Sequence, residues 1–360
     1  MIPATVKPPE VDDRGVRFRL ADAGSALTDV RLVADVRLPG DRRSFARTPD
    51  GNGWELRLDR PPLGRLEYQL ELRYADGRTE CGADPGNPRR APGPFGDKSV
   101  VELPGYVEPS WLRAEPPAGR TVELQLASRS LPARVRCLLW SSVGSADGVP
   151  LPLLVVHDGP EFAALAALLR FLDAMVAAGR LPAMRAALLA PPGDRSESYS
   201  AAPAYARALA LGLLPALEKL APTPAGRRGR IGMGASMGAL GLLHAQRRYP
   251  DVFGALFLQS GSYFQPRLDD MESGFPRFAR VTGFVRGVLR SGPGWPGAVP
   301  AVLTCGSVEE NLANNAAMAR ALAAQGYAAR LHVHPDAHNW VSWRDTFDPC
   351  LPELARSVWG

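Results

Sequence analysis

The segment with the clearest chemical meaning is Gly234-Ala-Ser236-Met-Gly238, which has the pattern G-x-S-x-G. It lies between a predicted strand over residues 229–233 and a predicted helix over residues 239–248. Glycines two positions before and after the serine allow the tight turn and close strand–helix packing of a nucleophile elbow. Such a turn raises the hydroxyl above the sheet edge, beside a helix N-terminus that favours developing negative charge. The pattern therefore predicts a nucleophilic serine at position 236.

The same segment permits a second interpretation, because Gly232, Gly234 and Gly238 also resemble a dinucleotide-binding loop between a strand and a helix. That loop usually occupies the first strand–helix turn of its domain and requires an acidic residue about 20 positions later. Here the motif lies late in its domain, and the corresponding position falls in an apolar strand at residues 256–258. We therefore favour the nucleophile.

A serine nucleophile needs a general base and an acid that orients the base, in the chain order serine, acid, histidine. His338 lies in a loop after the last predicted strand, which is the position expected for the base. The other histidines fit packing or sheet positions: His244 in the helix after the serine, His332 and His334 on one face of a strand, and His157 at a strand end near the expected oxyanion site.

The acid is expected after the preceding strand, in Cys305-Gly306-Ser-Val-Glu309-Glu310. We favour Glu309 over Glu310, because it lies three positions past the glycine, where such turns usually present their acid. Either glutamate has an alternative role, in which its negative charge stabilises the N-terminus of the next helix.

The oxyanion hole should use the backbone N–H of Met237, the residue after the nucleophile. Its second donor should come from the loop that follows the strand over residues 151–156. Pro160 has no N–H, so Gly159 or Glu161 must be the second donor if Pro160 occupies the usual donor position.

Two kinds of pattern organise the chain around these residues. From Gly15 to about Val101 apolar and polar residues alternate, with turn signals between the runs, which predicts a β-sandwich. After Arg120, apolar strands alternate with helices, which predicts an α/β fold with a mainly parallel sheet and helices on both faces. The expected domains are residues 1–108 and 119–360, joined by a linker rich in proline and glycine over residues 109–118.

Composition narrows the classes of partner. The 360 residues carry a formal net charge of +5, and nearly all cations are arginines scattered among carboxylates, which argues against nucleic acid. No apolar run approaches a membrane span, and the N-terminus lacks a signal-peptide pattern, so a cytoplasmic protein is expected. The cysteines have no metal-binding spacing, and we expect free, mostly buried thiols at Cys81, Cys137, Cys305 and Cys350. The oligomeric state stays open.

The second half resembles the enterochelin esterase and esterase D branch of the α/β-hydrolases. Besides the serine and histidine motifs, the matching stretches are Leu153–Gly159, Arg195–Tyr199, Leu213–Pro215, Arg248–Phe253, Ser260–Ser262, Cys305–Glu309, Asn315 and His338–Trp343. The first half resembles the immunoglobulin-like domain, related to glycogen-binding modules, that precedes the hydrolase in enterochelin esterases. Its matches are Gly53–Glu55, Tyr68, Asp84-Pro85, Asn87-Pro88, Phe95-Gly96 and Ser99–Pro104.

This resemblance implies ester hydrolysis, in the best-known members at the backbone esters of a ferric catecholate siderophore. It implies the roles of nucleophile for Ser236, base for His338 and acid for Glu309. Arg195 matches a family arginine that could hold an anionic small-molecule substrate, and the matched motifs also place Asp158, Tyr199 and Trp340 at the substrate site. No cofactor and no metal are implied.

Two departures from the family pattern concern the pocket. The usual Gly-Gly-His-Asp-Trp is Asp336-Ala-His-Asn339-Trp here, and the Asp-Gly loop continues into Pro160. The alternatives to a siderophore esterase are a carbohydrate-linked acetyl or feruloyl esterase, an acyltransferase with the same serine chemistry, and a non-catalytic glucan-binding protein. The last would need exposed aromatic residues, whereas Trp54 and Tyr68 lie in alternating strands and are expected in the core.

Overall fold

The computed structural model describes residues 7–36, 43–93 and 96–360, so Phe95 of the first-half matches lies outside the described residues. The chain divides into two compact units. Unit 1 comprises Met1–Val107 together with Gly306–Glu310 and Pro335–His338, and unit 2 comprises Glu108–Cys305, Asn311–His334 and Asn339–Gly360. The boundary after Val107 lies next to the predicted linker, which carries one short 3-10 helix at Ser110–Arg113.

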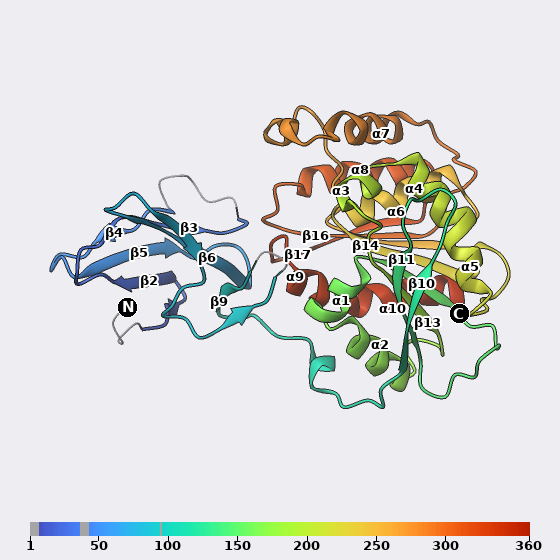
Figure 1. Cartoon of the computed structure of the whole chain (residues 1–360), viewed down its shortest axis with the longest axis horizontal. Coiled ribbons are helices and arrows are strands. Elements are labelled where there is room, and N and C mark those ends of the chain that lie inside the picture. The colour runs from blue at the N-terminus through green and yellow to red at the C-terminus, as the bar shows by residue number, and fades with distance from the viewer. Residues whose placement is uncertain (1–6, 37–42, 94–95) are drawn as a thin grey trace. The chain divides into compact units, whose positions relative to one another are not determined.

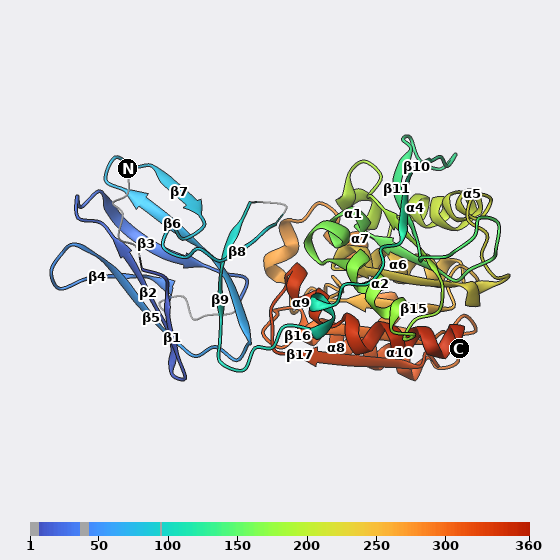
Figure 2. The same ribbon diagram turned by 90° about the horizontal axis from the view of Figure 1, so that it is seen from below.

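Unit 1 consists of antiparallel strands in two sheets (Figure 2). The first sheet has the order β1 (Glu10–Asp12), β2 (Gly15–Ala21), β5 (Gly53–Asp59) and β4 (Ala46–Arg47). The second has the order β3 (Leu27–Val33), β6 (Arg65–Tyr74), β9 (Lys98–Glu102) and β8 (Arg90–Ala91), with β7 (Thr79–Gly82) also paired to β6. Alternate residues of both sheets share one apolar cluster. Trp54 and Tyr68 belong to it, 7% and 0% exposed, which confirms their expected core positions.

Two loops of the C-terminal region belong to unit 1 through contacts that sequence patterns did not predict. Gly64 donates its backbone N–H to the carbonyl of Pro335 at 2.7 Å. The Ser307 hydroxyl donates to the carbonyl of Pro62 at 3.3 Å, and Val308 packs against the apolar cluster of unit 1. Because these loops carry Glu309 and His338, the contacts fix the backbone from which both side chains project.

Unit 2 is built on an eight-stranded mixed sheet. The strand order is β10 (Arg120–Leu126), β11 (Val135–Ser141), β13 (Arg185–Leu189), β12 (Leu153–His157), β14 (Arg230–Ala235), β15 (Ala255–Gln259), β16 (Ala301–Gly306) and β17 (Ala329–His334). The pairs from β13 to β16 are parallel, whereas β10 and β11 are antiparallel to their neighbours. The carboxyl ends of the parallel strands therefore share one edge of the sheet, where loops can gather functional groups.

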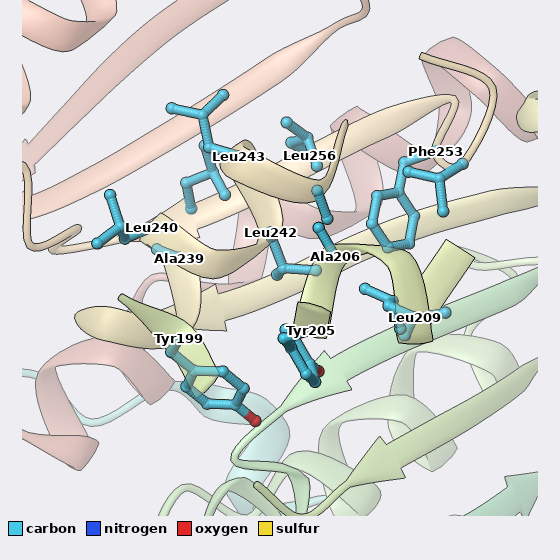
Figure 3. Packing of buried hydrophobic residues seen from close by; sticks show 14 of the residues in the cluster. Tyr199, Tyr205, Ala206, Leu209, Ala239, Leu240, Leu242, Leu243, Phe253 and Leu256 are labelled. Atoms are coloured by element: carbon cyan, nitrogen blue, oxygen red, sulfur yellow. The ribbon is translucent and has the colours of Figure 1, made fainter. Parts of the chain in front are cut away.

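Helices cover both faces of this sheet (Figure 1). Along β12, Leu153 and Val155 enter one apolar cluster and Leu154 and Val156 enter the other, because successive side chains of a strand point to opposite faces. The first cluster includes residues of α3 (Arg195–Tyr199), α4 (Pro203–Ala208), α5 (Leu214–Glu218), α6 (Met237–Arg248), α7 (Phe278–Arg290) and α8 (Leu312–Ala324). The second includes residues of α1 (Gly159–Leu165), α2 (Leu168–Ala177), α9 (Trp340–Asp345) and α10 (Phe347–Trp359). Figure 3 shows Leu240, Leu242 and Leu243 of α6 packed in the first cluster with residues of α3 and α4.

The helical spacing of apolar residues over 161–178 predicts a single helix, which is wrong, because the structure has two helices there, α1 and α2. Ala167 adopts a left-handed conformation (φ 49°) between α1 and α2, which an uninterrupted helix cannot contain. Over residues 203–220 the sequence also predicts one helix, and the structure has α4, a π-helical segment at Leu209–Leu213 and α5 in succession. Short 3-10 turns lie at Arg227–Gly229 and Asp270–Gly274. No helix among those the structure describes is long and apolar enough to cross a membrane.

Candidate active site

Ser236 lies on the turn between β14 and α6, as the glycine pattern predicts. Its backbone has φ 55° and ψ −124°, a strained conformation for a residue with a side chain. The turn is held because Ser236 donates its N–H to the carbonyl of Gln259 at 2.9 Å and accepts from the N–H of Ser262 at 3.2 Å. This turn requires glycine beside the serine, because a Cβ on Gly234 would lie only 3.0 Å from the backbone of Gly238. The half-buried hydroxyl of Ser236 is thus presented at the carboxyl edge of the sheet.

The structure brings Glu309 and His338 together. Nδ1 of His338 donates to Oε2 of Glu309 at 2.8 Å, and the Glu309 side chain is buried. The other carboxylate oxygen, Oε1, accepts the backbone N–H of Gly306 at 2.7 Å, which fixes the carboxylate within its own turn. Glu310 is exposed, so Glu309 is the carboxylate that binds the imidazole. Because Nδ1 carries the proton in this bond, the neutral ring has its lone pair on Nε2.

The pKa of His338 lies above its ordinary value of 6.5. Burial alone would lower this pKa, but the charge of Glu309 and its hydrogen bond to the ring outweigh burial. Asp35 and Glu310 add smaller contributions in the same direction. The imidazole is therefore a stronger proton acceptor than a free histidine.

Asp158 and Arg195 form a bidentate salt bridge. Nε and Nη2 of Arg195 donate to the two carboxylate oxygens of Asp158 at 2.7 and 2.8 Å. Asp158 is buried and Arg195 retains 38% of its side-chain exposure. The carboxylate of Asp158 therefore orients Arg195, and of the two side chains the arginine has more exposed surface.

The two residues expected to supply the oxyanion donors, Met237 and Gly159, both begin helices at this sheet edge. Met237 is the first residue of α6, so its N–H is among those that an α-helix leaves without an intrahelical partner. Gly159 is the first residue of α1, directly before Pro160. A Cβ on Gly159 would lie 2.3 Å from the backbone of Leu188, so only glycine fits there.

His157, which the sequence places at a strand end near the expected oxyanion site, makes buried contacts that were not predicted. Nδ1 of His157 lies 3.0 Å from the carbonyl oxygen of Gly238, and Nε2 lies 2.7 Å from the hydroxyl of Tyr205. A carbonyl only accepts, so Nδ1 carries the hydrogen and Tyr205 donates to Nε2. Burial lowers the pKa of His157 to about 4, which keeps the ring neutral. His157 thus ties the end of β12 to the first turn of α6.

The two aromatic side chains expected at the substrate site, Tyr199 and Trp340, differ in their exposure. Tyr199 is 0% exposed, and its ring stacks on His157 with centroids 4.5 Å apart, so it supports the site from within the core. Trp340 is half-buried at the start of α9, with its ring edge-on to Phe162 at 5.2 Å and to Trp343 at 4.8 Å. Of the two rings, only Trp340 retains exposed surface.

Among the described residues, no group of three or more histidine, cysteine, aspartate or glutamate side chains could hold a metal ion. The four cysteines, all within the described residues, form no disulfide, and Cys81 is exposed whereas Cys137, Cys305 and Cys350 are buried, in agreement with mostly buried thiols.

Comparison with known proteins gives this geometry a context. Residues 132–280 match the model of a family described as "Putative esterase". The iron(III) enterobactin esterase of Dickeya dadantii is 30% identical over 234 residues, which are 64% of this chain. The chain spans about half the length of that relative, 53%.

Solved structures agree with the sequence matches. The enterobactin esterase FES from Shigella flexneri, solved in the presence of 2,3-di-hydroxy-N-benzoyl-glycine, superposes with a TM-score of 0.75 at 20% identity. That match covers 98% of this chain and 97% of the other. A ferulic acid esterase has a TM-score of 0.57 at 21% identity and covers 67% of this chain and 99% of its own. The chain is therefore similar to the enterobactin esterases in sequence and fold, and its residues 132–280 match the esterase family model.

Proposed function

We propose that this protein is a serine esterase with Ser236 as nucleophile, His338 as general base and Glu309 as the acid. The observation that carries the proposal is the hydrogen bond between Glu309 and His338, two residues that follow Ser236 in the order such a triad requires. In finer terms, residues 119–360 form an α/β-hydrolase domain, and residues 1–108 form an immunoglobulin-like β-sandwich joined to it by residues 109–118. The cytoplasmic location remains a prediction from the sequence.

In the proposed mechanism the hydroxyl oxygen of Ser236 attacks the ester carbonyl carbon while Nε2 of His338 accepts the hydroxyl proton. Glu309 holds the Nδ1–H of the ring and stabilises the imidazolium that forms. The N–H groups of Met237 and Gly159 bind the carbonyl oxygen as it gains negative charge. Collapse of the tetrahedral intermediate expels the alcohol, which takes the proton from His338, and leaves an acyl group on Ser236.

Water then completes the reaction by the reverse sequence of proton transfers. His338 removes a proton from water, the hydroxide attacks the acyl carbon, and Ser236 leaves with the proton returned by the imidazolium. The products are a carboxylic acid and an alcohol. An acceptor alcohol in place of water would give acyl transfer by the same steps.

The proposed substrate class is an anionic, bulky ester of the ferric catecholate siderophore type. Support comes from the iron(III) enterobactin esterase of Dickeya dadantii and from a Shigella flexneri enterobactin esterase structure, solved with enterobactin, that covers 98% of this chain. Arg195 supports an anionic substrate, since its two bonds to Asp158 use Nε and Nη2 and leave Nη1 to donate to a substrate oxygen.

The substrate test compares hydrolysis of ferric enterobactin, a feruloyl sugar ester and p-nitrophenyl acetate by the purified full-length chain. We expect the highest kcat/KM for ferric enterobactin, with release of dihydroxybenzoyl-serine units followed by chromatography. A higher kcat/KM for the feruloyl ester would contradict the proposed substrate class. No hydrolysis of any of the three esters would contradict the esterase itself.

The acid can be tested by exchanging each glutamate of the pair in turn. Glu309→Gln removes the charge that raises the pKa of His338, so kcat/KM should fall on the order of 10²-fold or more. The base must be neutral to act, so wild-type kcat/KM should fall as pH drops through a pKa above 6.5, and in Glu309→Gln this fall should move to lower pH. Glu310→Gln is the matched control and should retain nearly all activity, because Glu310 is exposed. The reverse ranking of the two variants in a pH–rate series would assign the acid to Glu310.

A further inference from the structure

Ser262 contacts the proposed nucleophile directly. Its hydroxyl oxygen lies 3.1 Å from the hydroxyl oxygen of Ser236, which is hydrogen-bond distance. Its backbone N–H also donates to the carbonyl of Ser236 at 3.2 Å. Ser262 is 4% exposed, so little water competes for this hydroxyl.

The loop that carries Ser262, residues 260–262, is held in place from several directions. The Asn315 side chain makes two hydrogen bonds to the backbone of Gly261. Oδ1 of Asn315 accepts the Gly261 N–H at 2.9 Å, and Nδ2 of Asn315 donates to the Gly261 carbonyl at 3.0 Å. Ser260 adopts a left-handed φ of 46° and donates its N–H to the carbonyl of Thr304 at 2.7 Å. A strained backbone persists only where its surroundings fix it, so the position of Ser262 is set in advance.

Two further contacts link this loop to the segments that follow the proposed acid and base. Nδ2 of Asn311 donates to the Ser260 carbonyl at 3.0 Å, and Nε1 of Trp343 donates to the Ser260 hydroxyl at 3.0 Å. Asn311 comes two residues after Glu309, and Trp343 comes five residues after His338. The 260–262 loop is therefore bonded to both chain segments and to Ser236 itself.

We propose that Ser262 is a further catalytic residue, whose hydroxyl donates a hydrogen bond to the Ser236 oxygen during attack. The inference rests on the proposed function. In the attacking state the single hydroxyl proton of Ser236 is committed to His338, so the Ser236 oxygen can only accept from Ser262. This bond strengthens as the oxygen gains negative charge, because a hydrogen bond to an ionised acceptor is stronger than a neutral one.

The test measures the rate at which a fluorophosphonate labels Ser236, a reaction that needs the activated nucleophile but no particular ester. Ser262→Ala should slow labelling at least about tenfold, the loss expected for one hydrogen bond to a developing charge. In ester hydrolysis kcat should fall while KM changes little, since the bond acts in the transition state. Ser262→Cys keeps a similar volume but offers only a weak donor, so it should stay as slow as the alanine variant.

The matched control is Ser142→Ala, which removes another part-buried serine–serine contact, to Ser145 at 2.8 Å. Ser142 follows β11 at the opposite edge of the sheet, since Ser141 pairs with Arg185 at the start of β13. This control should be labelled at the wild-type rate. Labelling of Ser262→Ala at the wild-type rate would overturn the proposal, and so would restoration by Ser262→Cys, which would assign the loss to volume. Absence of labelling in the wild type would instead refute the proposed function.

Discussion

Ser236→Ala is expected to lower kcat/KM on every ester that the protein hydrolyses, on the order of 10³-fold or more. Without the hydroxyl no acyl-enzyme forms, and only the oxyanion donors and substrate binding remain to assist attack by water. The measurement is initial-rate hydrolysis of p-nitrophenyl acetate and ferric enterobactin, with the variant prepared free of wild-type protein.

The alanine variant should fold, because Ser236 is half-buried and its structural bonds are made by its backbone N–H and carbonyl. The positive φ of 55° strains the backbone of serine and alanine alike, so the substitution adds no new backbone strain. A thermal unfolding curve close to that of the wild type would show that lost turnover reflects chemistry. Turnover within about tenfold of the wild type would be incompatible with a serine nucleophile at this position.

His338→Ala is expected to produce the second-largest loss, about 10²–10⁴-fold in kcat/KM, as general-base catalysis disappears. Its chemical origin can be tested by adding imidazole, which should restore part of the rate by supplying the missing base in solution. The matched control is His332→Ala, because His332 is an exposed histidine on β17, the strand before the His338 loop. Equal losses in the two variants, or a full rate without His338, would rule out this base.

Sequence patterns could identify the proposed catalytic residues because their signals are local. The glycines beside Ser236 record the close approach of strand and helix, and a Cβ on Gly238 would indeed lie 3.1 Å from the Asp158 carboxylate. His338 was identified by its place after the last strand, since the loops at the carboxyl ends of parallel strands meet at one edge. Alternation of apolar residues likewise predicted the buried positions of Trp54 and Tyr68.

What sequence patterns missed depends on contacts between distant segments. His157 gives no local sign that it bonds Gly238 and Tyr205, which are 81 and 48 positions away. The interruption between α1 and α2 depends on the left-handed backbone at Ala167, where no glycine marks a break. The grouping of the 306–310 and 335–338 loops with unit 1 follows from Gly64 bonding Pro335, a pairing that no periodicity encodes.

The Ser262 contact lies between these cases. Ser260-Gly-Ser262 follows a predicted strand at the same sheet edge as Ser236, which could have pointed to proximity. The contact between the Ser236 and Ser262 hydroxyls depends on the left-handed backbone of Ser260 and on the hydrogen bonds between Asn315 and Gly261. Neither of these features can be seen in the sequence.

The most direct test of the proposed serine chemistry is the site of covalent capture. The wild-type chain is incubated with a fluorophosphonate, and the labelled peptide is identified by mass spectrometry after proteolysis. We predict one adduct per chain, located on Ser236 and lost in Ser236→Ala. Ester hydrolysis by the wild type without labelling, or with the adduct on another residue, would contradict Ser236 as the nucleophile.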